Sequence, residues 1–321
     1  MRIAVLIPCY NEAMAIGEVV RAFRSALPEA LIHVYDNNST DGTAEIAAAA
    51  GAIVRREPLQ GKGYVVRRMF ADIEADFYVL TDGDATYDAA AAPALLARAV
   101  ADQLDMVNAA RVTEERGAYR PGHRLGNRVL TGMVTLLFGR RLTDMLSGYR
   151  VFSRRFVKSF PAMSAGFEIE TELTVHALQL DLPIAEMRTV YRQRLPGSFS
   201  ALRTYRDGVR ILGCILRLIK HERPHLFFGM LALCLCVAGL GFGLPVIGDY
   251  WRTGLVPRLP TAVLATGLMI LAALSFFSGL ILDTVAAARL EARRLAYLRF
   301  GAPEGDGLGV ETGAQAAVTG S

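Results

Sequence analysis

Two long stretches without a charged residue, 226–248 and 259–282, constrain the fold of this chain more than any other feature. As helices, each would be about 35 Å long, enough to cross a hydrocarbon core of about 30 Å. Helices of a soluble core are rarely uncharged on every face over such a length, so we interpret both stretches as membrane spans. The chain is 52% hydrophobic yet 21% charged, so the apolar excess is concentrated in these spans.

Basic residues flank the pair of spans on both outer sides. Arginine is frequent in 203–223 and again in 289–299, whereas the connection at 249–258 holds only Arg252 and Arg258. The positive-inside rule therefore predicts that the hairpin tip faces outward and that both termini are cytoplasmic. The apolar run at the N-terminus is too short for a signal peptide, so we expect a multi-pass protein of the cytoplasmic (inner) membrane.

The part before the spans alternates short apolar runs with amphipathic patterns. Such alternation predicts an α/β fold with a mostly parallel sheet and helices on both faces. Ligands of open sheets of this kind bind beyond the carboxyl ends of the strands. The expected strands are 3–7, 32–35, 53–55, 77–80 and 106–109, and the expected helices are 16–27, 43–50 and 63–74.

The junctions between these parts are also visible in the sequence. An amphipathic, arginine-rich pattern before the first span predicts a helix in the membrane interface, and the aperiodic end of the chain predicts a disordered tail. The predicted parts are a cytoplasmic α/β domain (1–200), an interfacial helix (201–224), two transmembrane helices (225–248 and 259–283) and a cytoplasmic basic segment with a disordered tail (284–321).

An acidic pair, Asp82 and Asp84 with Gly83 between them, directly follows the expected strand 77–80. Two hard carboxylate ligands at a strand end suit Mg²⁺ or Mn²⁺ that bridges the phosphates of a nucleotide. The alternative is an Asp-Gly turn that caps the next helix. Polar residues also follow the first two strands, at 8–12 and 36–43, so we expect three strands to bring them to one edge.

Charge and cysteine content exclude other classes. The net charge of +4 is modest, and the basic residues gather beside the spans, which favours a lipid bilayer over nucleic acid as a partner. Cys9 comes at the end of an expected strand, and the other three cysteines lie in or beside apolar helices, so the four indicate no disulfide framework.

The polar motifs together resemble those of a known family. IPCYNE at 7–12, DNNSTDGT at 36–43, GKG at 61–63 and DGD at 82–84 resemble a family 2 glycosyltransferase. Three later motifs sharpen the resemblance to the dolichol- and polyprenyl-phosphate sugar synthases, over about residues 3–225. They are DMLSGYRVF at 144–152, GFEIETEL at 166–173 and YRQRLPGS at 191–198.

The resemblance implies a GT-A-type fold that binds a nucleotide sugar, and it assigns roles by position. Lys62 either reaches the diphosphate or is solvated, and for Asp41 the capping of a helix is favoured over the binding of ligand. Glu172, with Glu170, either orients substrate or lies on a helix surface. For each basic acceptor residue, contact with a lipid headgroup is the alternative. The implied groups are donor-binding Pro8, Tyr10, Glu12, Asp36, Asn37, Lys62, Asp82, Gly83 and Asp84, metal-binding Asp82 and Asp84, catalytic Asp82, Asp84, Arg111 and Glu172, and acceptor-phosphate-binding Arg111, Arg124, Arg128, Arg192, Arg194 and Ser198.

The chain departs from its relatives at two places. Leu173 stands where relatives with hydroxyl acceptors carry Asp, which fits a phosphate acceptor because a phosphate monoester, with a second pKa of about 6, needs no base. Phe199 and Ala201 stand where relatives carry a lysine, which weakens the phosphate-binding role of that loop.

These residues predict an inverting hexosyltransferase that moves a sugar from a UDP- or GDP-linked donor to polyprenyl phosphate at the cytoplasmic membrane face. The metal would be Mg²⁺ or Mn²⁺, and a homo-oligomer is compatible with the sequence. The alternatives are a family 2 enzyme with another membrane-associated acceptor, and a non-catalytic nucleotide-binding membrane module. Processive synthases carry a Gln-X-X-Arg-Trp motif, whereas the single tryptophan, Trp251, lies in the outward loop.

Overall fold

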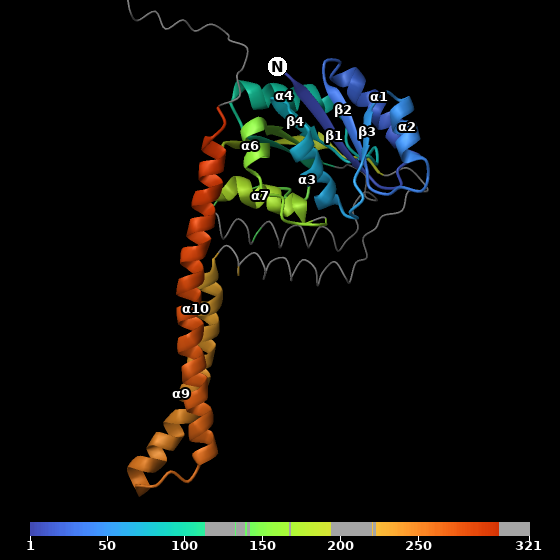
Figure 1. The fold of residues 1–321 in the computed structure, drawn as a ribbon. Helices are drawn as coiled ribbons and strands as arrows, with labels where there is room; N and C mark the ends of the chain where they lie inside the picture. The colour runs from blue at the N-terminus through green and yellow to red at the C-terminus, as the bar shows by residue number, and fades with distance from the viewer. Residues whose placement is uncertain are drawn as a thin grey trace, which may run out of the picture. The chain divides into compact units, whose positions relative to one another are not determined.

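The computed structural model describes residues 1–112, 142–166, 168–193 and 223–301, with the single positions 132, 139 and 220. The chain divides into two compact units, Met1–Leu202 with Arg293–Ser321, and Arg203–Ala292. Figure 1 shows a sheet with helices around it in the first unit and two long helices in the second.

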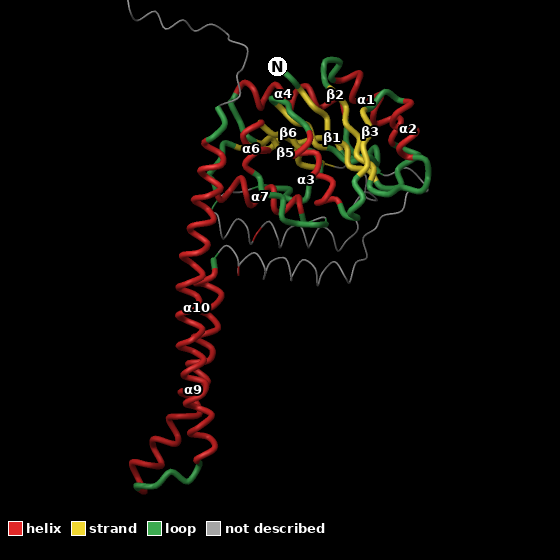
Figure 2. Tube along the Cα trace, viewed as in Figure 1, coloured by secondary structure: helices red, strands yellow, loops and turns green. Residues whose placement is uncertain are grey.

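A seven-stranded sheet forms the centre of the first unit, in the order β3-β2-β1-β4-β6-β5-β7 (Figure 2). Neighbouring strands are parallel except at β6, which runs antiparallel to β4 and β5. The predicted α/β fold with a mostly parallel sheet is confirmed. The strands are β1 (Ile3–Cys9), β2 (Leu31–Asp36), β3 (Ile53–Arg56), β4 (Phe77–Leu80), β5 (Met106–Val112), β6 (Arg150–Ser153) and β7 (Ile184–Val190).

Helices cover both faces because strand side chains alternate between the faces. Ile3, Val5 and Ile7 of β1 belong to the core cluster that includes Val20 and Phe23 of α1. On the other face an aromatic cluster joins Phe70 of α3 to β6 and α6. The helices are α1 (Ile16–Ala26), α2 (Thr43–Ala49), α3 (Lys62–Asp72), the 3₁₀ turn η1 (Ala89–Ala91), α4 (Ala92–Ala101), α6 (Arg154–Ser159) and α7 (Ile169–Gln179).

The second unit contains α9 (Pro224–Thr253) and most of α10 (Leu259–Leu298), both long and apolar enough to cross a membrane. They lie side by side (Figure 1), and the small residues Gly239, Ala265 and Gly279 are buried between them, as is common where membrane helices approach closely. α10 extends past the predicted span end at 283, because its last turns are rich in Ala, Leu and Arg, which are strong helix formers. The predicted interfacial helix and tail lie largely outside the described residues.

The end of α10, from Arg293, belongs to the first unit and contacts a buried carboxylate there. The Tyr297 hydroxyl donates to Asp105 Oδ2 at 2.8 Å, and Arg155 Nε donates to Asp105 Oδ1 at 2.5 Å. The Arg155 guanidinium also lies 4.9 Å from the centre of the Tyr297 ring. Asp105, which directly precedes β5, therefore links the end of α10 to the sheet.

Buried His176 of α7 gives the first unit a pH dependence. Its ring packs against Phe156 and Phe160, and burial, with the charge of Arg293, lowers its pKa to about 3. In the unfolded chain this histidine has an ordinary pKa of about 6.5, so between pH 6.5 and 3 the unfolded state binds more protons than the folded state. The contribution of neutral His176 to the free energy of unfolding is therefore fully present above pH 6.5 and is lost as the pH falls.

Between pH 7 and 4.5 we therefore expect wild type to lose about 2–3 kcal/mol more than His176→Gln. This corresponds to an apparent Tm difference of about 5–10 °C, measured by thermal unfolding in detergent at the two pH values. Equal losses in both proteins would contradict the assignment.

Candidate active site at the carboxyl edge of the sheet

Strands β1, β2 and β4 end at the same edge of the sheet. In the parallel register, Cys9 is opposite Asp36, and Leu6 is opposite Leu80. The polar segments that follow these strands are therefore neighbours, as the sequence predicts.

The segments after β1 and β2 are joined by hydrogen bonds from backbone N–H groups to side-chain oxygens. The Asn11 N–H donates to Ser39 Oγ at 2.9 Å, and the Thr40 N–H donates to Asn11 Oδ1 at 2.9 Å. The Glu12 N–H donates to Thr43 Oγ1 at 2.9 Å. Asn11 adopts a left-handed backbone with φ 54°, which Asn tolerates better than most residues. The IPCYNE and DNNSTDGT motifs thus form one folded unit.

Asp41 holds the start of α2 and fastens it to the first loop. Its Oδ1 accepts the Thr43 hydroxyl at 2.5 Å and the Thr43 N–H at 3.1 Å, and its Oδ2 accepts the Ala13 N–H at 3.0 Å. Burial, which by itself raises the pKa of Asp41, is outweighed by these hydrogen bonds, which lower it. Gly42 is the N-cap, so Asp41 caps the helix from one position earlier.

Asp36 is the last residue of β2 and Asn37 follows it, and their side chains differ in their hydrogen bonds. Asp36 is 6% exposed; its Oδ2 accepts the Ser39 N–H at 3.1 Å, while the buried Oδ1 has no hydrogen-bond partner among the described residues. The Asn37 amide donates to the carbonyls of Glu57 and Leu59, and its Oδ1 accepts the Gly61 N–H at 2.7 Å. Asn37 therefore holds the loop before α3, a structural role that the donor-binding expectation missed.

The remaining residues expected to contact the nucleoside are more accessible. Tyr10 is 51% exposed, Glu12 is partly buried and Pro8 is partly buried within β1, opposite Tyr35. All three lie on the β1 side of the carboxyl edge.

Lys62, at the start of α3, is enclosed between two carboxylates. Its Nζ lies 2.5 Å from Asp82 Oδ1 and 2.6 Å from Glu170 Oε1, and its side chain is 9% exposed. Burial by itself lowers the pKa of Lys62, but the charges of Asp82 and Glu170 raise it well above the usual value. Lys62 is therefore a buried cation, so the solvated alternative is wrong.

Two glycines make room for the acidic pair. A Cβ on Gly83 would lie 2.6 Å from Cys9 Sγ, and one on Gly148 would lie 2.5 Å from Asp82 Oδ2. Asp84 is buried, and its Oδ1 accepts the Thr86 hydroxyl at 2.6 Å. The pair is therefore closely packed on both sides, which accounts for glycine at these positions.

The donor set suits a divalent metal whose coordination is completed by a ligand. Among the described residues, no group of three or more His, Cys, Asp and Glu side chains is arranged to hold a metal ion. Two carboxylates are, however, what Mg²⁺ commonly takes from protein, with phosphate oxygens and water supplying the rest. The ammonium of Lys62 against Asp82 shows that this carboxylate already attracts a cation.

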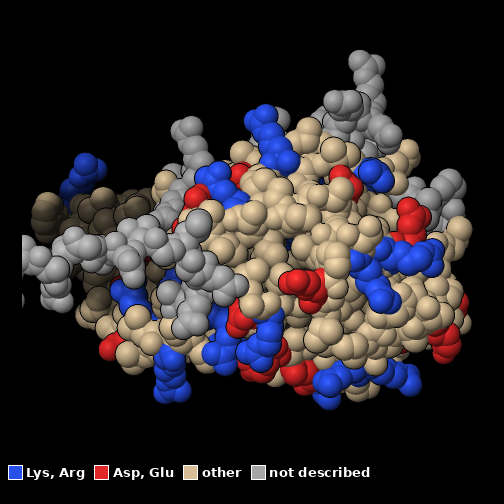
Figure 3. Space-filling model, turned by 90° about the horizontal axis from the view of Figure 1, so that it is seen from above, with Lys and Arg blue, Asp and Glu red and all other residues tan. Residues whose placement is uncertain are grey.

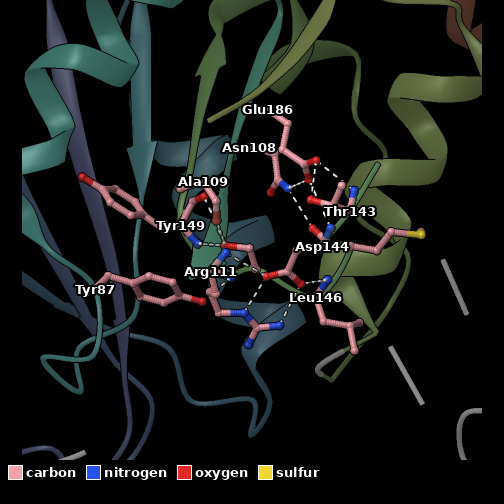
Figure 4. Close-up of polar contacts among 12 residues, drawn as sticks. Tyr87, Asn108, Ala109, Arg111, Thr143, Asp144, Leu146, Tyr149 and Glu186 are labelled. Atoms are coloured by element: carbon pink, nitrogen blue, oxygen red, sulfur yellow. Dashed lines mark hydrogen bonds and ion pairs between the residues drawn. The ribbon is translucent and has the colours of Figure 1, made fainter. Parts of the chain in front are cut away.

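Arg111, at the end of β5, is held by a polar network (Figure 4). Its Nε and Nη2 donate to the Asp144 carboxylate at 2.7 and 2.8 Å, and its guanidinium lies 5.4 Å from the centre of the Tyr191 ring. Burial by itself raises the pKa of Asp144, but the hydrogen bonds and charge of Arg111 lower it. Asn108 and Glu186 hold the Asp144 segment, with Asn108 Nδ2 donating to the Asp144 carbonyl at 2.7 Å and to Glu186 Oε1 at 2.8 Å.

Glu172 does not join the acidic pair. Its two carboxylate oxygens accept the backbone N–H groups of Met163 and Ser164, at 2.9 and 2.8 Å. The carbonyl of the next residue, Ala165, accepts the Gly63 N–H at 3.0 Å. Through these contacts Glu172 holds the loop that packs against Gly63, and its predicted role toward the substrate stays a prediction. Glu170, two residues earlier in α7, is the glutamate that contacts Lys62.

The expected acceptor residues are described only in part. Arg192 is mostly exposed, its guanidinium lies 3.5 Å from Asp88, and its N–H donates to the Thr86 carbonyl at 2.8 Å. Its backbone is thereby tied to the segment after the acidic pair. Four further predicted residues, Arg124, Arg128, Arg194 and Ser198, lie outside the described residues.

A cavity of about 450 Å³ lies between α1 and the segment 85–93, and Asp82 of the acidic pair is among its lining residues. Asp82, Tyr87, Asp88 and Arg192 line it together with α1. Over the face shown in Figure 3, basic and acidic side chains are interspersed.

Sequence reasoning missed two residues that organise the site. Asp144 pairs with Arg111, and Arg150 is fully buried, with its guanidinium donating to the carbonyls of Ser147 and Met145. Burial lowers the pKa of Arg150 to about 10, although nearby carboxylates, Glu170 first among them, act in the opposite direction. Both lie in the DMLSGYRVF motif, and the presence of charged residues in that motif could have pointed to them.

The sequence is similar to those of known proteins. Residues 4–160 match the model of the family described as Glycosyl transferase family 2. The chain is 34% identical to "Glycosyltransferase AglJ" of Haloferax volcanii over 250 residues, 77% of this chain and 82% of that protein. It is 27% identical to the "Dolichyl-phosphate hexose transferase" of the same organism, over 70% of this chain and 96% of that one.

Solved structures share the fold. Glucosyl-3-phosphoglycerate synthase from Mycobacterium tuberculosis, solved with Mn²⁺, uridine diphosphate and glucosyl-3-phosphoglycerate, superimposes with a TM-score of 0.54. The identity is 22%, and the match covers 68% of this chain and 78% of that one. The expected GT-A-type fold is thereby confirmed, and the family match with its curated relative confirms the expected enzyme class. This chain belongs to glycosyl transferase family 2 and is a glycosyltransferase.

Proposed function

We propose that this enzyme transfers a sugar from a nucleotide-sugar donor to the phosphate of a polyprenyl phosphate. The observation that carries the proposal is the acidic pair Asp82 and Asp84 at the carboxyl edge of the sheet, where Asp82 also lines an open cavity. Similarity to a dolichyl-phosphate hexose transferase supports the choice of acceptor.

The donor's nucleoside would bind where β1 and β2 end. The buried Asp36 Oδ1 has no hydrogen-bond partner among the described residues, and leaving such an oxygen unsatisfied costs free energy. An N–H of a nucleobase or a hydroxyl of a ribose would satisfy it. Tyr10 directly follows β1 at the same edge of the sheet and is half-exposed, so its ring is available to stack on a nucleobase.

A divalent ion, Mg²⁺ or Mn²⁺, would be held by Asp82 and Asp84 and by the donor diphosphate. When bound, it would neutralise the charge that develops on the leaving diphosphate. The complex of the M. tuberculosis synthase with Mn²⁺ and uridine diphosphate supports this assignment.

The transfer would be a single in-line displacement. An oxygen of the acceptor phosphate forms a bond to the anomeric carbon, the bond from that carbon to the diphosphate oxygen breaks, and the nucleoside diphosphate leaves. The configuration at the anomeric carbon inverts. The acceptor is already an anion at neutral pH, so no general base is required, which agrees with Leu173 in α7.

Arg111 would position the phosphates of donor or acceptor from a guanidinium fixed by Asp144. Arg192 and the predicted residues Arg124, Arg128, Arg194 and Ser198 would supply further contacts to the acceptor phosphate. We place the reaction at the cytoplasmic face of the membrane, with α9 and α10 as spans, because their basic flanks obey the positive-inside rule.

A transfer assay with membranes that contain this protein tests the proposal. With Mg²⁺ or Mn²⁺, label from a nucleotide sugar should enter the organic phase when polyprenyl phosphate is added, and chelation by EDTA should stop it. A panel of UDP- and GDP-linked sugars would identify the donor. Label that enters only water-soluble oligosaccharide would contradict the lipid-phosphate acceptor.

Glu172→Gln should weaken donor binding without stopping catalysis. A carboxamide can accept only one of the two N–H groups well, so the loop that contacts Gly63 loosens. Losing one such contact, worth about 1.4 kcal/mol, should raise the donor KM about tenfold with a smaller change in kcat. If Glu172 instead acts in the chemical step, kcat will fall and KM will not rise.

A further inference from the structure

The contact between Lys62 and Asp82 has a consequence for metal binding. The Lys62 ammonium lies 2.5 Å from Asp82 Oδ1, an oxygen of one of the two carboxylates to which we assign the metal. A divalent cation and an ammonium group cannot share one carboxylate oxygen at such a distance, because like charges this close repel strongly in a buried site. Metal binding through this oxygen therefore requires Lys62 to move.

Glu170 gives Lys62 a second partner. Its Oε1 lies 2.6 Å from the ammonium, and its side chain is 8% exposed. A buried cation that lost its only partner would be strongly destabilised. Because Glu170 is present, Lys62 can give up Asp82 and keep one ion pair.

The backbone around Lys62 is fixed, so only its side chain can make this exchange. The Gly63 N–H donates to the Ala165 carbonyl at 3.0 Å, and a Cβ on Gly63 would lie 2.0 Å from the Ser164 carbonyl oxygen. α3 thus begins under a closely packed loop. The ammonium is held on a flexible stem between two carboxylates, one from the segment that follows β4 and one from α7.

We propose that Lys62 is an internal counter-ion that occupies Asp82 before the metal binds and is then displaced toward Glu170. This inference rests on the proposed function, which assigns the metal to Asp82 and Asp84. It implies that metal alone binds weakly and that the negative diphosphate of the donor strengthens metal binding. Lys62 thereby makes occupation of the metal site depend on the donor.

Mn²⁺ titration of the full-length protein in detergent, followed by electron paramagnetic resonance without nucleotide, tests the proposal. Lys62→Met should bind Mn²⁺ about tenfold more tightly than wild type, because Asp82 is released and a repelling charge is removed. Glu170→Gln should bind it more weakly, because the ammonium then loses the carboxylate toward which it would be displaced.

The double variant Lys62→Met/Glu170→Gln separates local competition from net charge. It has the same net charge as wild type, so an effect of charge alone predicts wild-type affinity. Competition for Asp82 predicts tighter binding than in wild type. The double variant also removes both buried charges together, which folded proteins tolerate better than the loss of one partner.

Asp84→Asn, added to each protein, should abolish the bound Mn²⁺ signal and so show that the signal arises at this site. Wild-type or weaker affinity in Lys62→Met, or in the double variant if the single one does not fold, overturns the inference. The transfer assay distinguishes this inference from the proposed function. If the wild-type enzyme transfers sugar but the variants bind Mn²⁺ with wild-type affinity, only the role of Lys62 is overturned. If no donor supports transfer, the proposed function is overturned.

Discussion

Asp84→Asn should reduce sugar transfer by at least about 10³-fold, because metal stabilisation of a leaving group is worth several kcal/mol. The substitution keeps the size of a buried side chain whose Oδ1 accepts the Thr86 hydroxyl, so the fold should persist. It removes one of the two carboxylate charges that would hold a divalent ion at this site. Initial rates at saturating donor and metal give the measurement.

Asp102→Asn is the matched control. Asp102 pairs with Arg98 on the surface of α4, so the same change of charge occurs away from the acidic pair. Its activity should stay within about twofold of wild type, since an exposed pair of this kind contributes at most about 1 kcal/mol. Full activity in Asp84→Asn would show that catalysis does not depend on a metal held by this carboxylate.

Asp144→Ala should have the largest effect on stability. Arg111 and Asp144 are 14% and 7% exposed and share two charge-assisted hydrogen bonds. Removing the carboxylate leaves a largely buried guanidinium without its main partner, which costs about 3–5 kcal/mol. The apparent Tm in detergent should fall by about 10 °C or more.

Arg111→Met/Asp144→Leu separates stability from catalysis. Replacing both charges by apolar groups should restore most of the lost stability. If Arg111 positions a phosphate, this stable variant should still be at least about 10²-fold less active than wild type. A double variant with full activity would show that Arg111 serves the fold alone, and an unchanged Tm in Asp144→Ala would contradict the importance of the pair.

The fold was predictable where local patterns are regular. β4 begins and ends as predicted, and α1 and β2 differ by a residue at their ends, because apolar runs and helical spacing repeat there. β6 was missed because it has only four residues and begins at Arg150, whose burial no hydrophobicity pattern indicates. The continuation of α10 was missed because prediction there followed hydrophobicity, which ends before the helix does.

The site was predictable in its residue types but not in their pairing. The acidic pair and the strand-end motifs lie together, since parallel strands bring their carboxyl ends to one edge. The partners of Lys62 were not readable, because Glu170 is 108 residues away in the sequence. Glu170 and Glu172 are two residues apart on α7, and only the packing of the helix decides which one faces the site.

The most direct test of the central claim is the structure of the reaction product. The purified protein is incubated with its nucleotide sugar, Mn²⁺ and a short-chain polyprenyl phosphate, and the lipid is analysed by mass spectrometry and ³¹P NMR. We predict a lipid phosphodiester joined to the anomeric carbon with inverted configuration, and one nucleoside diphosphate released for each sugar transferred. Unmodified lipid, or sugar found only on a hydroxyl acceptor, would contradict the account.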